Sequence, residues 1–185
     1  MLAAHGLPAT FFVVGKALRE HRALVERAHA EGHRVGNHTL THPRPLGESS
    51  DPVAEIAATQ DELGPLGAER LFRPSGAGGA IEPGLLSPPA VTALVAGGFT
   101  CVLWNAVPGD WRDPDGWVER ALAQCRAAGR TLLVLHDLPT GAMDHLERFL
   151  DAALAEGMRF TQALPEACLP IVRGVVVRPL DRLGG

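Results

Sequence analysis

The sequence predicts one α/β domain built on a parallel sheet, and three observations predict it. The chain has 185 residues, 46% of them hydrophobic, which is enough for one substantial core and gives little reason to propose a second domain. Short apolar runs rich in aromatic and β-branched residues alternate with longer stretches whose apolar residues fall at helical spacing. Gly and Pro separate the segments. Such alternation is typical of a parallel sheet with helical crossovers.

The first half of the chain contains two strands and two helices by this reasoning. In order, we expect a strand at 9–14 (ATFFVV), a helix at 16–31, a strand around 33–37 and a helix at 52–63. Gly32 supplies a stop for the first helix. Asp51 is placed as the N-cap of the second, with proline at its first helical position. Leu71 and Phe72 then lead into RPSGAGGAIEPG, which we interpret as a loop.

The second half continues the alternation. The expected elements are a helix at 89–96, a strand at 99–104, a helix at 116–128, a strand at 131–135 and a helix at 143–156. The tail after Met158 contains a short strand-like piece and a Val175-Val176-Val177 run, which the pattern does not assign.

Composition excludes several classes of protein. The net charge is −4 and the aromatic content is 5%, so no basic surface is available for nucleic acid, and we expect no nucleic-acid partner. The cysteines Cys101, Cys125 and Cys168 are far apart and odd in number, which indicates buried thiols. No apolar run approaches the roughly 20 residues of a transmembrane helix, and the N-terminus as written lacks the charged segment, apolar stretch and cleavage site of an export signal. As written, the chain is expected to be cytoplasmic.

His38 and His42 form the first group of residues with chemical potential, in the motif HTLTHP at the end of a predicted strand. Two imidazoles four residues apart can converge on one cation, and neutral imidazole is a good zinc ligand. The same spacing also arises by chance in a chain with eight histidines. A catalytic zinc needs a third ligand that this pair does not supply.

His136 follows the apolar run TLLV directly, at the carboxyl end of a predicted strand. Ligands bind at that end of parallel sheets, and a histidine there is suited to proton transfer near neutral pH. The alternative is a histidine that only satisfies hydrogen bonds at the end of a strand.

Asp110, Trp111 and Arg73 complete the candidate set. Asp110 and Trp111 follow another predicted strand, where they could supply a charge partner and an apolar wall for a sugar face. The guanidinium of Arg73 could orient a carboxylate through a two-point contact. A loop carboxylate beside a partly buried tryptophan, and an ordinary surface arginine, are the structural alternatives.

These groups stand in an order that resembles the polysaccharide deacetylase family, the NodB-homology domain of carbohydrate esterase family 4. The resemblance rests on GLPATFFVVG, EGHRVGNHTLTHP, LFRPSG, VLWNAVPGDW, LLVLHD and an AEGMRF segment like the family's closing strand. The matching stretches run from about Gly6 to Phe160, and HTLTHP in its EGHRVGN context is the most specific of them.

The resemblance implies a distorted (β/α) barrel in which a divalent metal, commonly zinc, polarises an acetamide carbonyl and activates water. It assigns roles to seven residues: His38 and His42 as metal ligands, His136 as the general acid, Asp110 as the group that tunes it, Arg73 as an orienter of carboxylates, and Trp111 and Leu135 as walls of the acetyl pocket. Amide hydrolysis needs a polarised carbonyl, a deprotonated water and a proton for the departing nitrogen, so these residue types suit these roles.

Two features depart from the family pattern. Its first motif, a strand ending in Thr-Phe-Asp-Asp-Gly, supplies the catalytic base and the third metal ligand and would lie upstream of GLPATFF. Only five residues precede Gly6, so we expect that strand and its aspartate pair to be missing, which would leave a barrel edge unpaired. The RPSG stretch is also shorter than the family's usual RPPYG, at the backbone that would stabilise the oxyanion.

Two explanations account for the missing aspartates. We favour the first, in which Met1 is a wrongly chosen start and the protein extends upstream, with a secreted or envelope location if an export signal is present. In the second, the chain is an inactive, metal-poor relative. The acids that could replace the missing ligand are Asp51, Asp61 and Asp137.

The leading functional hypothesis is a metal-dependent hydrolase that removes acetyl groups from N-acetylated sugars or polysaccharides. One alternative is a catalytically impaired family member that binds a glycan or a partner without hydrolysis. Another is an amidase that acts on a small non-sugar amide. Acetate release separates the first hypothesis from the second, and a panel of chito-oligosaccharides and small amides separates it from the third.

Overall fold

A computed structural model of the chain describes residues 1–76, 78–79 and 81–180. Contacts within the chain divide it into two compact units. Unit 1 consists of Met1–Leu7 and Trp104–Cys168, and unit 2 consists of Pro8–Leu103 and Leu169–Gly185. The expectation of a single domain stays a prediction, and each unit is described below by itself.

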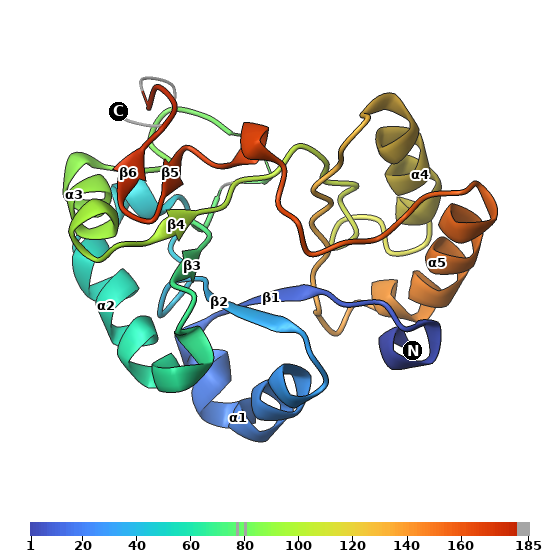
Figure 1. Cartoon of the computed structure of the whole chain (residues 1–185), viewed down its shortest axis with the longest axis horizontal. Helices are drawn as coiled ribbons and strands as arrows, with labels where there is room; N and C mark the ends of the chain where they lie inside the picture. Colours follow the sequence, from blue (N-terminus) through green and yellow to red (C-terminus); the bar gives the residue numbers. More distant parts are fainter. Residues whose placement is uncertain (77, 80, 181–185) are drawn as a thin grey trace. The chain divides into compact units, whose positions relative to one another are not determined.

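Unit 2 is built on a mixed sheet that has six strands within the described residues, in the order β1-β2-β3-β4-β5-β6 (Figure 1). The strands are β1 (Thr10–Val13), β2 (Arg34–Asn37), β3 (Leu71–Phe72), β4 (Thr100–Cys101), β5 (Ile171–Val172) and β6 (Val175–Val176). Neighbours from β1 to β4 pair in parallel, whereas β4 with β5 and β5 with β6 are antiparallel. The predicted α/β class and parallel pairing are therefore confirmed for the first four strands. The barrel form stays a prediction, since the strand order describes an open sheet.

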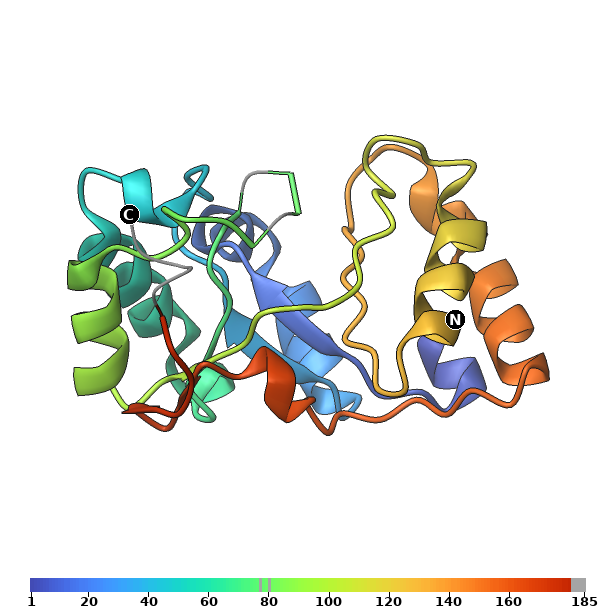
Figure 2. The same cartoon turned by 90° about the horizontal axis from the view of Figure 1, so that it is seen from above.

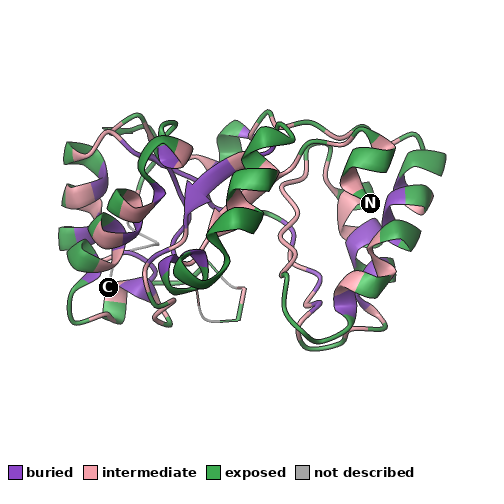
Figure 3. Cartoon of the chain, turned by 90° about the horizontal axis from the view of Figure 1, so that it is seen from below, coloured by how far each residue is buried: buried purple, intermediate pink, exposed green. Residues whose placement is uncertain are grey.

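Three helices pack on this sheet: α1 (Gly15–Ala30), α2 (Pro52–Leu63) and α3 (Pro88–Ala96). They follow one another around it (Figure 1), and Leu18, Val35 and Leu63 form a core cluster between helix and strand. The outward faces of the helices are exposed (Figure 3). Helix α2 begins as predicted, because the Asp51 side chain accepts a hydrogen bond from Ala54 N at 2.9 Å and Pro52 occupies the first turn.

Short helices and loops connect these elements. The 3-10 helices η2 (Leu46–Glu48) and η3 (Gly64–Gly67) flank α2. The stretch at 73–84 contains no helix or strand among its described residues, which agrees with the predicted loop, and its residues 77 and 80 lie outside the described part.

Unit 1 is a helical unit around its own core. Its elements are η1 (Leu2–His5), α4 (Trp117–Ala127), η4 (Ala142–His145), α5 (Leu146–Ala155) and η5 (Glu166–Cys168). Helices α4 and α5 lie side by side (Figures 1 and 2) over a cluster that includes Trp117, Phe149 and Leu150. The indole Nε1 of Trp117 donates to Ala142 O at 2.9 Å, so its one polar group is satisfied inside the core.

Two linked expectations for the second half of the chain are wrong: a strand at 131–135, and the position of His136 at the carboxyl end of that strand. No strand forms at 131–135 within the described residues, where one parallel bridge joins Ala106 and Leu133. The side chain of Asn105 accepts from Leu132 N at 2.7 Å and donates to Arg130 O at 2.9 Å, so a side chain takes hydrogen bonds that a strand ladder would otherwise make. His136 therefore follows a bridge rather than a strand.

The boundaries of two other elements shift. The strand expected at 99–104 shortens to β4, and the helix expected at 143–156 starts as the 3-10 helix η4 before α5 begins at Leu146. The unassigned valine run forms β6, whose Val176 pairs with Ile171.

The cysteines form no disulfide within the chain, and two of the three are buried as expected. All three cysteines are free thiols, with Cys101 and Cys168 buried and Cys125 partly buried. Among the residues that the structure describes, none of the helices has the length and apolar character needed to cross a membrane.

Candidate active site

The turn between His38 and His42, here called the HTLTH turn, follows β2 in unit 2. Its first residue stays attached to the sheet, because His38 N donates to Val13 O at 2.9 Å. The backbone then adopts positive φ at Thr39 (67°) and at His42 (59°), and the two histidine rings meet edge to face with their centroids 4.8 Å apart. The structure thus brings these two imidazoles side by side, and their binding of one cation stays a prediction.

His38 also has the hydrogen bond that a metal-binding histidine needs. Its Nδ1 lies 2.8 Å from the carbonyl oxygen of Arg73, the residue that follows β3. A proton on Nδ1 donated to this carbonyl leaves the lone pair of Nε2 available to a cation and fixes the orientation of the ring. The two imidazoles could therefore supply two of the ligands of a metal site.

A complete set of protein ligands is not found around this pair. Within 1–76, 78–79 and 81–180, no group of three or more His, Cys, Asp or Glu side chains could hold a metal ion. Asp51 serves as the N-cap of α2, and Asp61 is exposed on the same helix, so neither joins the histidines as a third ligand. Burial raises the pKa of the Cys101 thiol to about 12, which keeps it protonated and unsuited to bind a metal at neutral pH.

Arg73 lies inside unit 2 rather than on its surface. Its side chain donates from Nε to Val102 O at 3.2 Å and from Nη2 to Leu103 O at 3.4 Å, and its guanidinium carbon lies 4.2 Å from the ring centroid of Phe12. Only 8% of the residue is exposed. These contacts tie the end of β3 to the segment after β4, and the orientation of a carboxylate by Arg73 stays a prediction.

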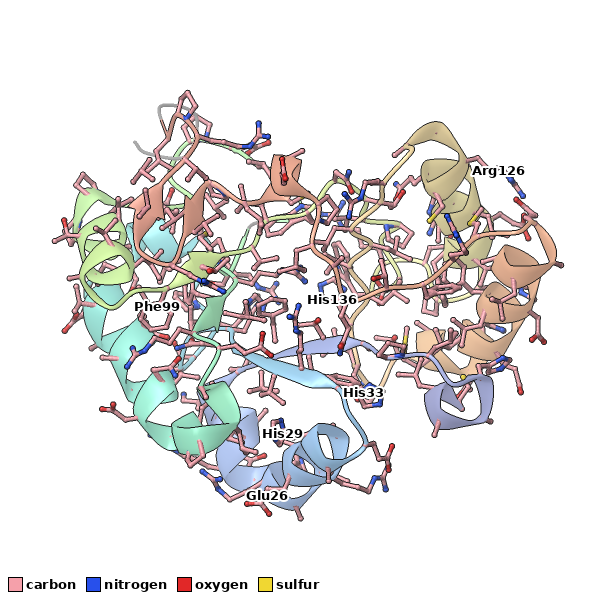
Figure 4. All side chains as sticks on the ribbon, viewed as in Figure 1. Glu26, His29, His33, Phe99, Arg126 and His136 are labelled. Atoms are coloured by element: carbon pink, nitrogen blue, oxygen red, sulfur yellow. The ribbon has the colours of Figure 1, made fainter. Side chains whose placement is uncertain are left out.

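Asp110 and His136 form a close pair in unit 1. The Asp110 side chain is fully buried, its Oδ1 lies 3.0 Å from His136 Nδ1, and its Oδ2 accepts from His136 N at 2.8 Å. His136 is labelled in Figure 4. A carboxylate only accepts hydrogen bonds, so the ring donates from Nδ1 and is held in one orientation, which leaves Nε2 as the nitrogen available to other partners.

Trp111 and Leu135 flank this pair along the chain. The Trp111 ring meets the His136 ring edge to face, with centroids 4.5 Å apart, so an indole borders the imidazole. Leu135 packs against the core cluster of unit 1. Asp137 is exposed beside His136. That Trp111 and Leu135 wall an acetyl pocket stays a prediction.

Two side chains that shape the HTLTH turn were missed by sequence reasoning. The Asn37 side chain accepts from Thr39 N at 2.9 Å, and the Glu55 carboxylate accepts from the backbone of Leu40 and Thr41. Asn37 stands directly before the motif, where its short amide is suited to such a local bond. The contact of Glu55 with the turn could not be predicted from sequence spacing, because it depends on the packing of α2 beside the turn.

Comparisons with known proteins point in one direction. Residues 1–78 match the family model described as polysaccharide deacetylase. A chitooligosaccharide deacetylase of Sinorhizobium fredii is 30% identical over 191 residues, which cover 98% of this chain and 81% of that protein. One from Rhizobium leguminosarum bv. trifolii is 35% identical over 143 residues, which cover 74% of this chain and 62% of that protein. A solved polysaccharide deacetylase from Bacillus cereus superposes with a TM-score of 0.71 at 25% identity, over 92% of this chain and 86% of that one.

Proposed function

The chain belongs to the polysaccharide deacetylase family, and from this premise we propose that it is a metal-dependent hydrolase that removes N-acetyl groups from acetylated sugars. The observation that carries the proposal is the HTLTH turn, in which His38 and His42 stand side by side and a backbone carbonyl orients His38. In this proposal the two histidines hold a divalent cation, with zinc as the first candidate because imidazole suits it. When bound, such a cation polarises the acetyl carbonyl and lowers the pKa of a coordinated water.

The Asp110–His136 pair supplies the proton in this proposal. Deacetylation adds the oxygen of water to the acetyl carbonyl carbon, breaks the carbon–nitrogen bond and requires a proton on the departing amine. His136 Nε2 donates that proton, while the buried Asp110 carboxylate accepts from Nδ1 and fixes the orientation of the ring. Acetate and a free amino sugar are the products.

The substrate class follows from the relatives. The two relatives compared above are named for chitooligosaccharides, so we propose an N-acetylglucosamine-containing oligosaccharide as the substrate. The indole of Trp111, next to the proposed acid, is suited to the apolar face of a sugar ring. That the protein acts on such a glycan is part of this proposal.

Alanine substitution of the histidine pair tests the function. His38→Ala and His42→Ala each remove one imidazole, so zinc binding measured by calorimetry should fall below detection, and acetate release from chito-oligosaccharides should fall at least about a hundredfold. His29→Ala is the matched control, because His29 is an exposed histidine on α1 (Figure 4) whose loss should leave both quantities unchanged.

Three outcomes would contradict the proposal. Full zinc binding and acetate release by His38→Ala would remove the histidines from the site. A wild-type chain that binds a chito-oligosaccharide and releases no acetate would indicate a binding protein. Release of acetate only from small non-sugar amides in the same panel would indicate an amidase.

A further inference from the structure

The HTLTH turn has a backbone conformation that is costly for its residues. Thr39 is β-branched and has a φ of 67°, and His42 has a φ of 59°. Residues other than glycine avoid this region, β-branched ones most of all, and such conformations persist only where the surroundings hold them. Something in unit 2 must therefore keep the turn in shape.

The hydrogen bonds of the turn identify what holds it. All five backbone N–H groups have a partner: His38 N donates to Val13 O, Thr39 N to Asn37 Oδ1, Leu40 N and Thr41 N to Glu55 Oε2, and His42 N to Thr39 Oγ1. Two of the five thus converge on one carboxylate that lies 14 and 15 residues further along the chain. The other three acceptors are Val13 O on the neighbouring strand β1, Asn37 Oδ1 directly before the turn, and Thr39 Oγ1 within it.

Glu55 makes three bonds to the turn. Its Oε2 accepts from Leu40 N and from Thr41 N, each at 2.8 Å, and its Oε1 accepts from Thr41 Oγ1 at 2.6 Å. Both carboxylate oxygens are therefore engaged with the middle of the turn. Bonds to a charged acceptor are stronger than bonds between neutral groups, so this contact fixes Leu40 and Thr41 better than an amide would.

Glu55 is itself carried by a fixed helix. The next residue, Ile56, is 2% exposed, and its carbonyl accepts from Asn37 Nδ2 at 2.8 Å. One turn further along, Thr59 is fully buried. Asn37 therefore connects both the turn and α2, which keeps the Glu55 backbone in register with its target.

The opposite side of the turn is bound by the start of α1. Gly15 N donates to Thr39 O at 2.9 Å and Lys16 N donates to Leu40 O at 3.0 Å. A Cβ on Gly15 would lie 2.7 Å from Thr59 Oγ1, so α1 and α2 approach too closely for a larger residue. The turn is thereby clamped between the N–H groups of one helix and the carboxylate of the other.

We propose that Glu55 is a positioning residue that holds the HTLTH turn in its metal-binding form and so sets the affinity of His38 and His42 for a divalent cation. It acts through the backbone of Leu40 and Thr41 rather than as a ligand. The inference rests on the proposed function, which assigns the two histidines to the metal.

Substitutions at Glu55 test this role. Glu55→Ala removes all three bonds, and Glu55→Gln leaves one acceptor oxygen for three donors. Zinc affinity, measured by competition with a chromophoric chelator, should fall about 10- to 100-fold for Glu55→Ala, as is usual for loss of a residue that supports a ligand, and by less for Glu55→Gln. The absorption bands of the cobalt-substituted variants should shift, because they report the geometry of the two imidazoles.

The control and a metal-free measurement separate positioning from general damage to the helix. Glu62→Gln removes another carboxylate from α2, one that pairs with Arg19, and should leave zinc affinity unchanged. In the metal-free protein, the Leu40 and Thr41 amides should exchange with solvent faster in Glu55→Ala, while the α2 amides remain protected.

Each result bears on the proposal. Wild-type zinc affinity in Glu55→Ala overturns the positioning role and leaves the proposed function standing. Affinity that falls equally in Glu62→Gln overturns it too, since the effect would then belong to the helix as a whole. A wild-type chain that binds no zinc overturns the proposed function, and the inference with it, whatever the exchange data show.

Discussion

At the residue scale, the two oxygens of Asp110 each serve one atom of His136. Oδ2 accepts from the backbone N–H and Oδ1 faces the ring Nδ1, in a side chain that is fully buried. A carboxylate can satisfy both at once because it only accepts hydrogen bonds, whereas an amide of the same shape offers one acceptor and one donor group. The ability of Asp110 to accept at both oxygens, and not its shape, is therefore what holds the backbone and the ring of His136 together.

Asp110→Asn tests this point. With its oxygen bound to His136 N, the new amide presents its NH2 group to Nδ1, so the ring must accept there and a proton on Nδ1 would clash with the amide. We expect kcat for acetate release to fall about a hundredfold with little change in KM, because proton donation is lost and binding is retained.

Asp115→Asn provides the matched control for Asp110→Asn. Asp115 also contacts a histidine, His145 Nε2 at 3.3 Å, but its side chain is 94% exposed. Its substitution should leave kcat unchanged. An Asp110→Asn protein with wild-type kcat would show that His136 is not the proton donor.

At the element scale, helices α4 and α5 are joined at one end by a two-point ion pair. Arg126 donates to Glu156 from Nε at 2.8 Å and from Nη2 at 2.5 Å (Arg126 is labelled in Figure 4). The hydrogen bond from Arg126 is the main reason that the pKa of Glu156 lies below its ordinary value, and the same bond raises the pKa of Arg126. Both residues lie at the surface, so solvent screens the pair.

The lowered pKa of Glu156 predicts how this pair responds to pH. A carboxyl group whose pKa is depressed by folding stabilises the protein above its unfolded pKa, and the contribution is lost as pH falls through the folded pKa. Removing the pair should therefore lower Tm by no more than about 2 °C at pH 7, and by nothing measurable once the pH is well below about 4.

A double-mutant cycle of Arg126→Gln and Glu156→Gln, followed by thermal melts, measures the coupling between these two side chains. The coupling should also shrink in high salt. A coupling that persists unchanged at acid pH would mean that the two side chains interact through packing and not through charge.

Sequence predicted the elements of unit 2 better than those of unit 1. The bounds of α2 follow from local chemistry, since Asp51 caps it and Pro52 opens it, and the buried run of β1 has the length and residue types of a strand. The strand expected at 131–135 failed because the Asn105 side chain takes the place of a ladder partner. A pattern of apolar residues does not show which distant side chain will bind a backbone group.

In the candidate site, too, local features were predicted from the sequence and contacts between distant segments were not. The HTLTH spacing brought His38 and His42 together as predicted, because four residues of one turn decide it. Glu55 was missed because its contact with Leu40 and Thr41 depends on where α2 packs. Local geometry can be predicted from spacing, whereas a supporting contact between two elements depends on tertiary structure.

At the scale of the whole molecule, each unit has a hydrophobic core of its own. The core of unit 1 includes Phe149, which is 2% exposed, and that of unit 2 includes Leu18, which is 1% exposed. Leu2 and Leu7, from the first residues of the chain, pack against the core of unit 1. Unit 1 thus draws on two segments separated by nearly a hundred residues of sequence.

Alanine substitutions in the two cores should therefore speed the hydrogen exchange of different backbone amides. Phe149→Ala should destabilise the protein by about 3–5 kcal/mol and Leu18→Ala by about 2–5 kcal/mol, because each removes a buried side chain. Urea denaturation gives the loss of stability, and native-state hydrogen exchange locates it. We expect faster exchange in α4 and α5 for the first variant, and in α1 and β2 for the second. Identical exchange maps would mean that the two cores open as one.

The contact between Trp111 and His136 gives the protein a built-in optical reporter. A protonated imidazole against an indole quenches its fluorescence, and Trp111 meets His136 with ring centroids 4.5 Å apart. The other two tryptophans are Trp104, which is 8% exposed, and Trp117, which is fully buried. The ionisation of the proposed proton donor can therefore be followed in the unlabelled protein by emission intensity, with Trp111→Phe as the blank.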